Sequence, residues 1–287
     1  MKVNQGYFKV YTRQPDMECY PDGLAHSIHI AYKAENGEFH PLNKNYGMLF
    51  AKAEIAQNQT ICPKGVKNPV RVCKKDGSWL AEDGITLDMT YIKTKRASYM
   101  VWSYRKDIAT PLDTGSMLYI ATIDEKEPWI LTSNPVLLSR PLLGWENVAG
   151  TINNEGPYAF LKDDKVFLTY SGGSANGYTY AVGLFTANEE DDLLDISVWT
   201  KRNTPVVSFC SVDGEYGPGH NSFYIDEDGE LMIAYHAEIG LQEHLRCDGI
   251  RRVHFREDGT PDFELTTEQE LQESLRHVKM KLRIKAE

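Results

Sequence analysis

The stretch Thr151-Ile152-Asn153-Asn154-Glu155-Gly156-Pro157-Tyr158 places a carboxylate directly before a Gly-Pro pair, and a strand pattern follows it. Pro157 lacks a backbone N–H and has a fixed φ, so this stretch cannot lie comfortably inside a helix. We therefore expect Glu155 to stand at the entrance of a β-strand. The constrained backbone there would aim its side chain in one direction.

Two similar stretches flank this one. Residues 86–91, which contain Asp88, precede it, and residues 216–223, which contain His220, follow it. The chain advances 67 residues from Asp88 to Glu155 and 65 from Glu155 to His220. A polar residue that recurs at the opening of strand-rich segments indicates a repeat architecture with its chemistry at one end.

Five strand-rich blocks can be followed along the chain, with turns rich in Gly, Asp and Asn. In the first block, residues 7–13 and 26–32 have strand patterns. A full block has about the length of a β-propeller blade, and helical patterns are scarce. The sequence thus predicts an all-β fold, a five-bladed β-propeller made by a single domain over residues 1–287.

The C-terminal segment 277–285 alternates apolar and basic residues, which is typical of a strand with one solvated face. Such a strand could complete an early blade, close the ring and cover the sheet edge. The alternative is a basic helical tail.

The composition of the chain argues against nucleic acids and membranes as partners. The formal net charge of −10 argues against a nucleic-acid backbone, and no apolar run is long enough to cross a membrane. The five cysteines are scattered and form no CxxC pair, which is typical of a reducing compartment. No apolar leader is visible after Met1, so we expect a cytoplasmic protein, with a removed signal peptide as the alternative.

Carboxylates suggest the chemistry. Glycoside hydrolysis needs two carboxyl groups across the scissile bond. Asp88 and Glu155 are candidates because both open strand-rich blocks at matched positions. A further carboxylate near the acid would raise the pKa of that acid by like-charge repulsion. The alternative is that both side chains only bind turn amides.

Three motifs in one order carry a family resemblance, which covers about residues 80–262. They resemble glycoside hydrolase family 43 and its relatives in the runs Leu87-Asp88 with Tyr99–Trp102, Asn154–Tyr158 with Thr169–Gly173, and Gly217–Ser222 with Ala234–His236 and Asp258–Pro261.

The resemblance implies a five-bladed β-propeller and an inverting reaction on arabinose- or xylose-containing glycans, so the partner would be a small oligosaccharide or glycan. By resemblance, Glu155 matches the general acid, and Asp88 matches the carboxylate that orients this acid and tunes its pKa. His220 matches a histidine that helps to hold a central calcium or its waters. Arg246 falls near an active-site arginine position.

The general base is not identified. In the family it is an Asp just ahead of a strand of the first blade, but residues 1–5 contain no acid. Asn68, in Lys67-Asn68-Pro69-Val70, has the closest similar setting, yet an amide cannot take a proton from water. Nothing in the sequence selects among the other nearby carboxylates, which are Asp16, Glu18, Asp22 and Asp83.

Further residues could contact a sugar. Trp102 and Trp145 are candidates for a sugar subsite, and His26 could face the pocket. Each has an ordinary alternative as a core or sheet residue. We expect Trp129 and Trp199 to be core residues and His236 to be structural.

The foremost hypothesis is an exo-acting α-L-arabinofuranosidase, followed by a β-xylosidase. A carbohydrate-binding propeller that has lost catalysis and a related glycoside phosphorylase remain alternatives.

Overall fold

The computed structural model describes residues 8–13, 27–33, 38–45, 49–50, 54–55, 61–62, 84–108, 110–128, 130–150, 152–241 and 245–264. The chain divides into two compact units, Met1–Pro69 and Val70–Glu287, and each is described by itself. The single-domain organisation stays a prediction. The expected closing strand at 277–285 lies outside the described residues.

The first unit contains short antiparallel strands. β1 (Phe8–Arg13) pairs with β2 (Ser27–Lys33), and β2 also pairs with β3 (Phe39–Pro41) and β4 (Leu49–Phe50). A second pair joins β5 (Glu54–Ile55) to β6 (Ile61–Cys62), and η2 (Asn43–Asn45) is a 3₁₀ turn. The two strands predicted for the first block are therefore confirmed.

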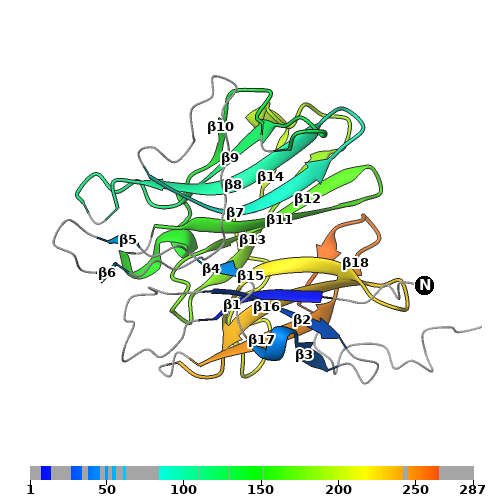
Figure 1. The fold of residues 1–287 in the computed structure, drawn as a ribbon. Helices are drawn as coiled ribbons and strands as arrows, with labels where there is room; N and C mark the ends of the chain where they lie inside the picture. The colour runs from blue at the N-terminus through cyan, green and yellow to red at the C-terminus, as the bar shows by residue number, and fades with distance from the viewer. Residues whose placement is uncertain are drawn as a thin grey trace, which may run out of the picture. The chain divides into compact units, whose positions relative to one another are not determined.

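The second unit contains three larger antiparallel sheets (Figure 1). The first has the order β10-β9-β8-β7, the second β11-β12-β13-β14 and the third β15-β16-β17. Their bounds are β7 Gly84–Lys93, β8 Ser98–Lys106, β9 Met117–Thr122, β10 Val136–Ser139, β11 Asn154–Lys162, β12 Lys165–Gly172, β13 Ala181–Asn188, β14 Thr200–Lys201, β15 Tyr216–Ile225, β16 Leu231–Glu238 and β17 Arg246–Arg252.

Smaller elements complete the second unit. β18 (His254–Phe255) pairs with β19 (Pro261–Asp262). The only helical segments among its described residues are the 3₁₀ helices η3 (Gly144–Gly150) and η4 (Ile196–Val198). In the described part of the chain, no helix has the length and apolarity needed to span a membrane.

Apolar side chains on both faces of the sheets form the core. Successive residues of a strand point to opposite faces, so β8 contributes Tyr99 and Val101 to one cluster and Met100 and Trp102 to another. The first of these clusters also contains residues of β12 and β13, and therefore joins the first sheet to the second. A further cluster joins the second sheet to the third through Phe160, Phe167, Val182, Leu184, Phe223, Ile233 and Tyr235.

The first strand of each large sheet carries a β-bulge, which adds a residue to one strand and bends it. The register shifts lie between Leu87 and Thr90, between Glu155 and Tyr158, and between Gly219 and Ser222. The first residue inside each bulge has a positive φ: 53° at Asp88, 55° at Gly156 and 51° at His220. Asp88 and His220 are thus equivalent, but their partner in the second sheet is Gly156. Glu155 lies one residue earlier, which corrects the predicted matched positions of Asp88 and Glu155.

Candidate active site

Asp88 is a buried carboxylate at the bulge of β7. Asp88 is 9% exposed. Its φ is positive, and Asp adopts this backbone conformation more readily than most residues do. Oδ2 accepts a hydrogen bond of 3.2 Å from the backbone N–H of Gly156 in the neighbouring sheet. Oδ1 lies 3.4 Å from Nε2 of His220. One side chain therefore connects the bulges of all three sheets.

Glu155 is half-buried at the start of β11. Its Oε1 accepts a hydrogen bond of 2.7 Å from the hydroxyl of Tyr180. Burial, followed by the negative charge of Glu155, raises the pKa of Tyr180 well above its usual value. Tyr180 therefore keeps its proton and can only donate to this carboxylate. Sequence reasoning missed Tyr180, because the turn that precedes β13 carries no recognisable motif.

Two imidazole rings complete the cluster. The ring of His236 stacks on Tyr180 with a centroid distance of 5.6 Å and lies 6.3 Å from the ring of His220. The backbone N–H of His220 donates a hydrogen bond of 2.7 Å to Ser171 Oγ, and Ser171 pairs with Glu155 across the sheet. His236, expected to be only structural, is thus part of the cluster around Glu155.

Two glycines leave room for these rings. A Cβ on Gly156 would lie 3.2 Å from Cγ of His220, and a Cβ on Gly219 would lie 2.2 Å from the ring of Tyr180. Gly219 is the counterpart of Glu155 in the third sheet, because each directly precedes its bulge. Its missing side chain lets the Tyr180 ring reach Glu155.

Arg105 is a cation near the same carboxylate. It donates hydrogen bonds of 2.9 and 2.7 Å to the two carboxylate oxygens of Asp113. These bonds raise the pKa of Arg105, and the charge of Glu155 raises it further. Arg105 could not be predicted from the sequence, because a lone arginine in a strand has no distinguishing pattern.

The two tryptophans predicted for a sugar subsite lie in different settings. Trp102 is 0% exposed and stacks on Tyr119 in the core, so its predicted contact with a sugar is corrected. Trp145 is half-buried in η3, where its indole N–H donates to the carbonyl of Asn203 and its ring packs on Tyr170. As predicted, Trp199 is a core residue, 8% exposed.

Arg246 lies at the first position of β17, paired in register with Glu238. Its guanidinium donates a hydrogen bond of 3.0 Å to the carbonyl of Ala175, and its Nε lies 3.7 Å from Glu238 Oε1. Glu238 follows His236 by two residues on the same strand, so the two side chains share one face of β16. Arg246 is therefore placed near the end of β16 that carries His236.

Several predicted site residues lie outside the described part of the chain. They are His26 and Asn68, together with the four carboxylates considered as substitutes for the base, Asp16, Glu18, Asp22 and Asp83. Trp129, expected to be a core residue, also lies outside the described residues.

The described residues do not form a set of calcium ligands. Calcium prefers six to eight oxygen ligands. His220 offers a ring nitrogen instead, and Nε2 of this ring faces the carboxylate of Asp88. The described residues contain no group of three or more His, Cys, Asp or Glu side chains that could hold a metal. The calcium stays a prediction, and no step below depends on it.

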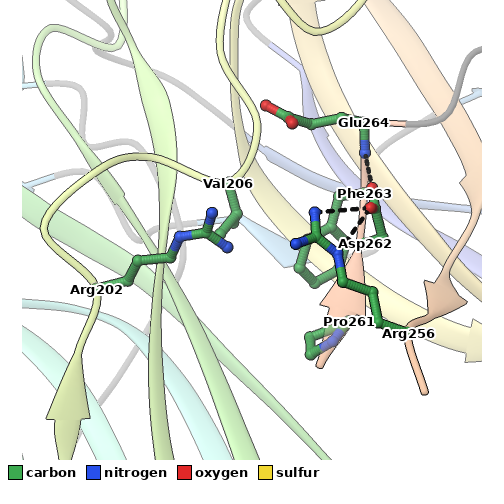
Figure 2. Close-up of a pocket in the computed structure, with 7 residues that line it drawn as sticks. All are labelled: Arg202, Val206, Arg256, Pro261, Asp262, Phe263 and Glu264. Atoms are coloured by element: carbon green, nitrogen blue, oxygen red, sulfur yellow. Dashed lines mark hydrogen bonds and ion pairs between the residues drawn. The ribbon is translucent and has the colours of Figure 1, made fainter. Parts of the chain in front are cut away.

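A small cavity elsewhere in the second unit has a different lining (Figure 2). Arg256 there donates hydrogen bonds of 3.2 and 3.0 Å to Asp262, and Arg202 faces the same opening. None of its seven lining residues belongs to the cluster around Glu155, so we assign this cavity no part in the chemistry.

Comparison with known proteins gives a consistent picture. Residues 40–261 match the sequence model described as "Glycosyl hydrolases family 43". An extracellular exo-α-(1→5)-L-arabinofuranosidase of Streptomyces avermitilis is 31% identical over 245 residues, covering 79% of this chain and 48% of that protein. The corresponding enzyme of Streptomyces chartreusis is 37% identical over 158 residues, covering 55% of this chain and 46% of that protein.

A solved structure is also similar. An α-L-arabinofuranosidase from Lactobacillus brevis has a TM-score of 0.55 and 26% identity, covering 91% of this chain and 73% of that one. The chain spans about half the length, or less, of the curated relatives it matches.

The predicted cytoplasmic location is wrong. It is overturned by the relatives at 31% and 37% identity, whose names describe extracellular enzymes. Scattered cysteines were a weak basis for that prediction, because cysteines without a recognisable pairing pattern occur in proteins of either compartment.

Proposed function

Because the chain belongs to glycosyl hydrolase family 43, whose fold is the predicted five-bladed β-propeller, we propose that it is an exo-acting α-L-arabinofuranosidase. The observation that carries this proposal is the pair formed by Glu155 and Asp88. Glu155 accepts a hydrogen bond of 2.7 Å from the hydroxyl of Tyr180. The buried Asp88 accepts a hydrogen bond from the backbone N–H of Gly156, the residue that follows Glu155.

Glu155 acts as the general acid that protonates the leaving oxygen of the glycosidic bond. The hydroxyl of Tyr180 occupies Oε1, so the transferable proton is carried by Oε2. With Oε1 fixed, the carboxyl group cannot rotate freely, and Oε2 keeps one direction. A proton donor must lie within hydrogen-bond reach of the atom that it protonates, and this fixed direction supplies that geometry.

Asp88 orients the acid. Its carboxylate holds the backbone N–H of Gly156 and therefore fixes the peptide that follows Glu155. Burial makes an unpaired carboxylate costly, and the imidazole of His220 on the other oxygen offsets that cost. The proposal assigns no residue as the base that activates the attacking water.

Arabinose is preferred over xylose as the sugar released because the curated relatives at 31% and 37% identity are named exo-α-(1→5)-L-arabinofuranosidases. An extracellular place of action is part of the same proposal and has the same support. An inverting reaction requires two carboxyl groups far enough apart to admit a water molecule.

The proposal is tested by incubating the protein separately with α-1,5-linked arabino-oligosaccharides and with β-1,4-linked xylo-oligosaccharides. Release of arabinose, appearing first as the β-anomer in a proton NMR time course, is the expected result. Xylose release alone would replace the assignment by a β-xylosidase. Arabino-oligosaccharide binding in calorimetry without any sugar release would identify a binding protein instead, and turnover only with added phosphate would identify a phosphorylase.

A further inference from the structure

A buried ion pair lies close to the start of β11, the strand that carries Glu155. Glu146, in η3, is 0% exposed, and its Oε1 lies 2.5 Å from Nζ of Lys201 in β14. The same oxygen accepts a hydrogen bond of 2.7 Å from the hydroxyl of Tyr170, and Oε2 accepts one of 2.9 Å from the backbone N–H of Leu143. Neither oxygen of this acid is left without a partner.

Lys201 continues the network toward β11. Its ammonium group donates to Ser139 Oγ at 3.0 Å and approaches Asn154 Oδ1 at 3.5 Å. Ser139 in turn donates to the same Asn154 oxygen at 2.7 Å. Burial lowers the pKa of Lys201, and the hydrogen bond and charge of Glu146 oppose that shift.

The residue at the end of this network directly precedes Glu155. Asn154 is 0% exposed, and its side chain also donates to the carbonyl of Asn153. Its backbone N–H donates to the carbonyl of Ser116, and the N–H of Asn153 donates to the carbonyl of Glu146. The two residues before Glu155 are therefore fixed by backbone hydrogen bonds and by the side chain of Asn154.

The network meets β11 on the face opposite to the side chain of Glu155. Successive side chains of a strand point to opposite faces, so Asn154 faces away from the side on which Glu155 meets Tyr180. A buried ion pair gives little net stability compared with an apolar replacement. A role in holding one geometry explains better why a charged pair is found at this position.

We propose that Lys201 and Glu146 are positioning residues that hold Asn154, and through it aim the carboxyl group of Glu155 at the leaving oxygen. This inference rests on the proposed role of Glu155 as the general acid. It adds residues that neither motif nor family resemblance had singled out.

The test measures how activity depends on the leaving group. A displaced acid slows substrates whose leaving group needs a proton, whereas a 2,4-dinitrophenyl arabinofuranoside departs without one. For Lys201→Met we expect kcat on arabino-oligosaccharides to fall by about tenfold to a hundredfold with little change in KM. On the dinitrophenyl substrate kcat should change by less than about threefold.

Further variants separate positioning from folding. Lys201→Met leaves the Glu146 charge unpaired, so the charge-balanced variant Lys201→Met/Glu146→Gln is measured beside it, with thermal unfolding of both. The matched control is Lys95→Met. It removes an exposed ion pair in which Lys95 Nζ lies 2.7 Å from Oδ1 of Asp164. Lys201→Arg keeps the cation and should recover part of the lost activity on oligosaccharides.

The outcomes are distinct. Equal losses on both substrates in the charge-balanced variant, or no loss on either, would overturn the positioning role. If the unsubstituted protein releases arabinose from neither substrate, the proposed function fails, and the failure is not that of the network.

Discussion

The backbone N–H of Gly156 donates a hydrogen bond of 3.2 Å to Oδ2 of Asp88, although 68 residues separate the two in sequence. The bond joins the bulge of one sheet to the bulge of the next. It places the buried carboxylate of Asp88 beside the peptide that follows Glu155. The bulges of the two sheets, each with a positive φ at its first residue, therefore bring Asp88 close to Glu155.

Replacing Gly156 by alanine should disturb both the fold and the activity. Its φ of 55° is unfavourable for residues with a Cβ, and the added methyl would lie 3.2 Å from the His220 ring. We expect Gly156→Ala to lower the free energy of unfolding by about 1–3 kcal/mol and to reduce kcat. Urea unfolding followed by tryptophan fluorescence measures the first effect.

Gly229→Ala is the control for this substitution. Gly229 also has a positive φ, of 83°, but an added Cβ would meet no atom of the described residues within 4 Å. It should therefore report the backbone strain alone, with activity unchanged. Equal losses of activity in the two variants would show that contact with His220 has no part in the effect.

Tyr180→Phe should lower kcat by about tenfold on arabino-oligosaccharides, because it removes the 2.7 Å hydrogen bond that fixes one oxygen of Glu155. Gly219→Ala should have a similar effect, since the added methyl would occupy the space of the Tyr180 ring. Steady-state kinetics of both variants check the prediction. An unchanged kcat in Tyr180→Phe would remove Tyr180 from the account.

Stability should fall at alkaline pH partly through Tyr170. Burial, followed by the charge of Glu146, holds the pKa of Tyr170 well above its usual value. The unfolded chain then loses this proton near pH 10, while the folded chain keeps it. The stability due to this shift is complete below about pH 10 and is lost as pH rises above it.

Tyr170→Phe tests that sign. The variant should be less stable than the unsubstituted protein at pH 8, because Glu146 loses a buried hydrogen bond of 2.7 Å. The gap between the two proteins should then narrow above about pH 10, as the tyrosine contribution disappears. A gap that widens with pH would contradict the assigned direction.

Sequence reasoning succeeded where a short-range constraint determines structure. The Gly156-Pro157 pair excludes a helix, so Glu155 had to open a strand, as it does in β11. The alternating pattern of residues 26–32 likewise predicted β2. The matched positions were wrong by one residue because the bulge, which depends on pairing with the next strand, cannot be read from spacing.

The remaining site residues depend on long-range packing. Trp102 is of a residue type that often stacks on sugar rings. It is buried because β8 lies between two other strands and both faces of β8 are covered. Tyr180 and Lys201 lie in segments without a motif, and their partners are distant in sequence. Each such contact is made by tertiary structure, which local patterns do not encode.

The central claim is that Glu155 donates the proton to the leaving oxygen. The most direct measurement is kcat of Glu155→Gln on an α-1,5-linked arabino-oligosaccharide, with thermal unfolding to confirm that the variant is folded. We predict that kcat falls by about 10²–10⁴-fold, because glutamine keeps the shape of the side chain but its amide cannot act as an acid. A folded variant with a rate close to that of the unsubstituted protein would contradict the account.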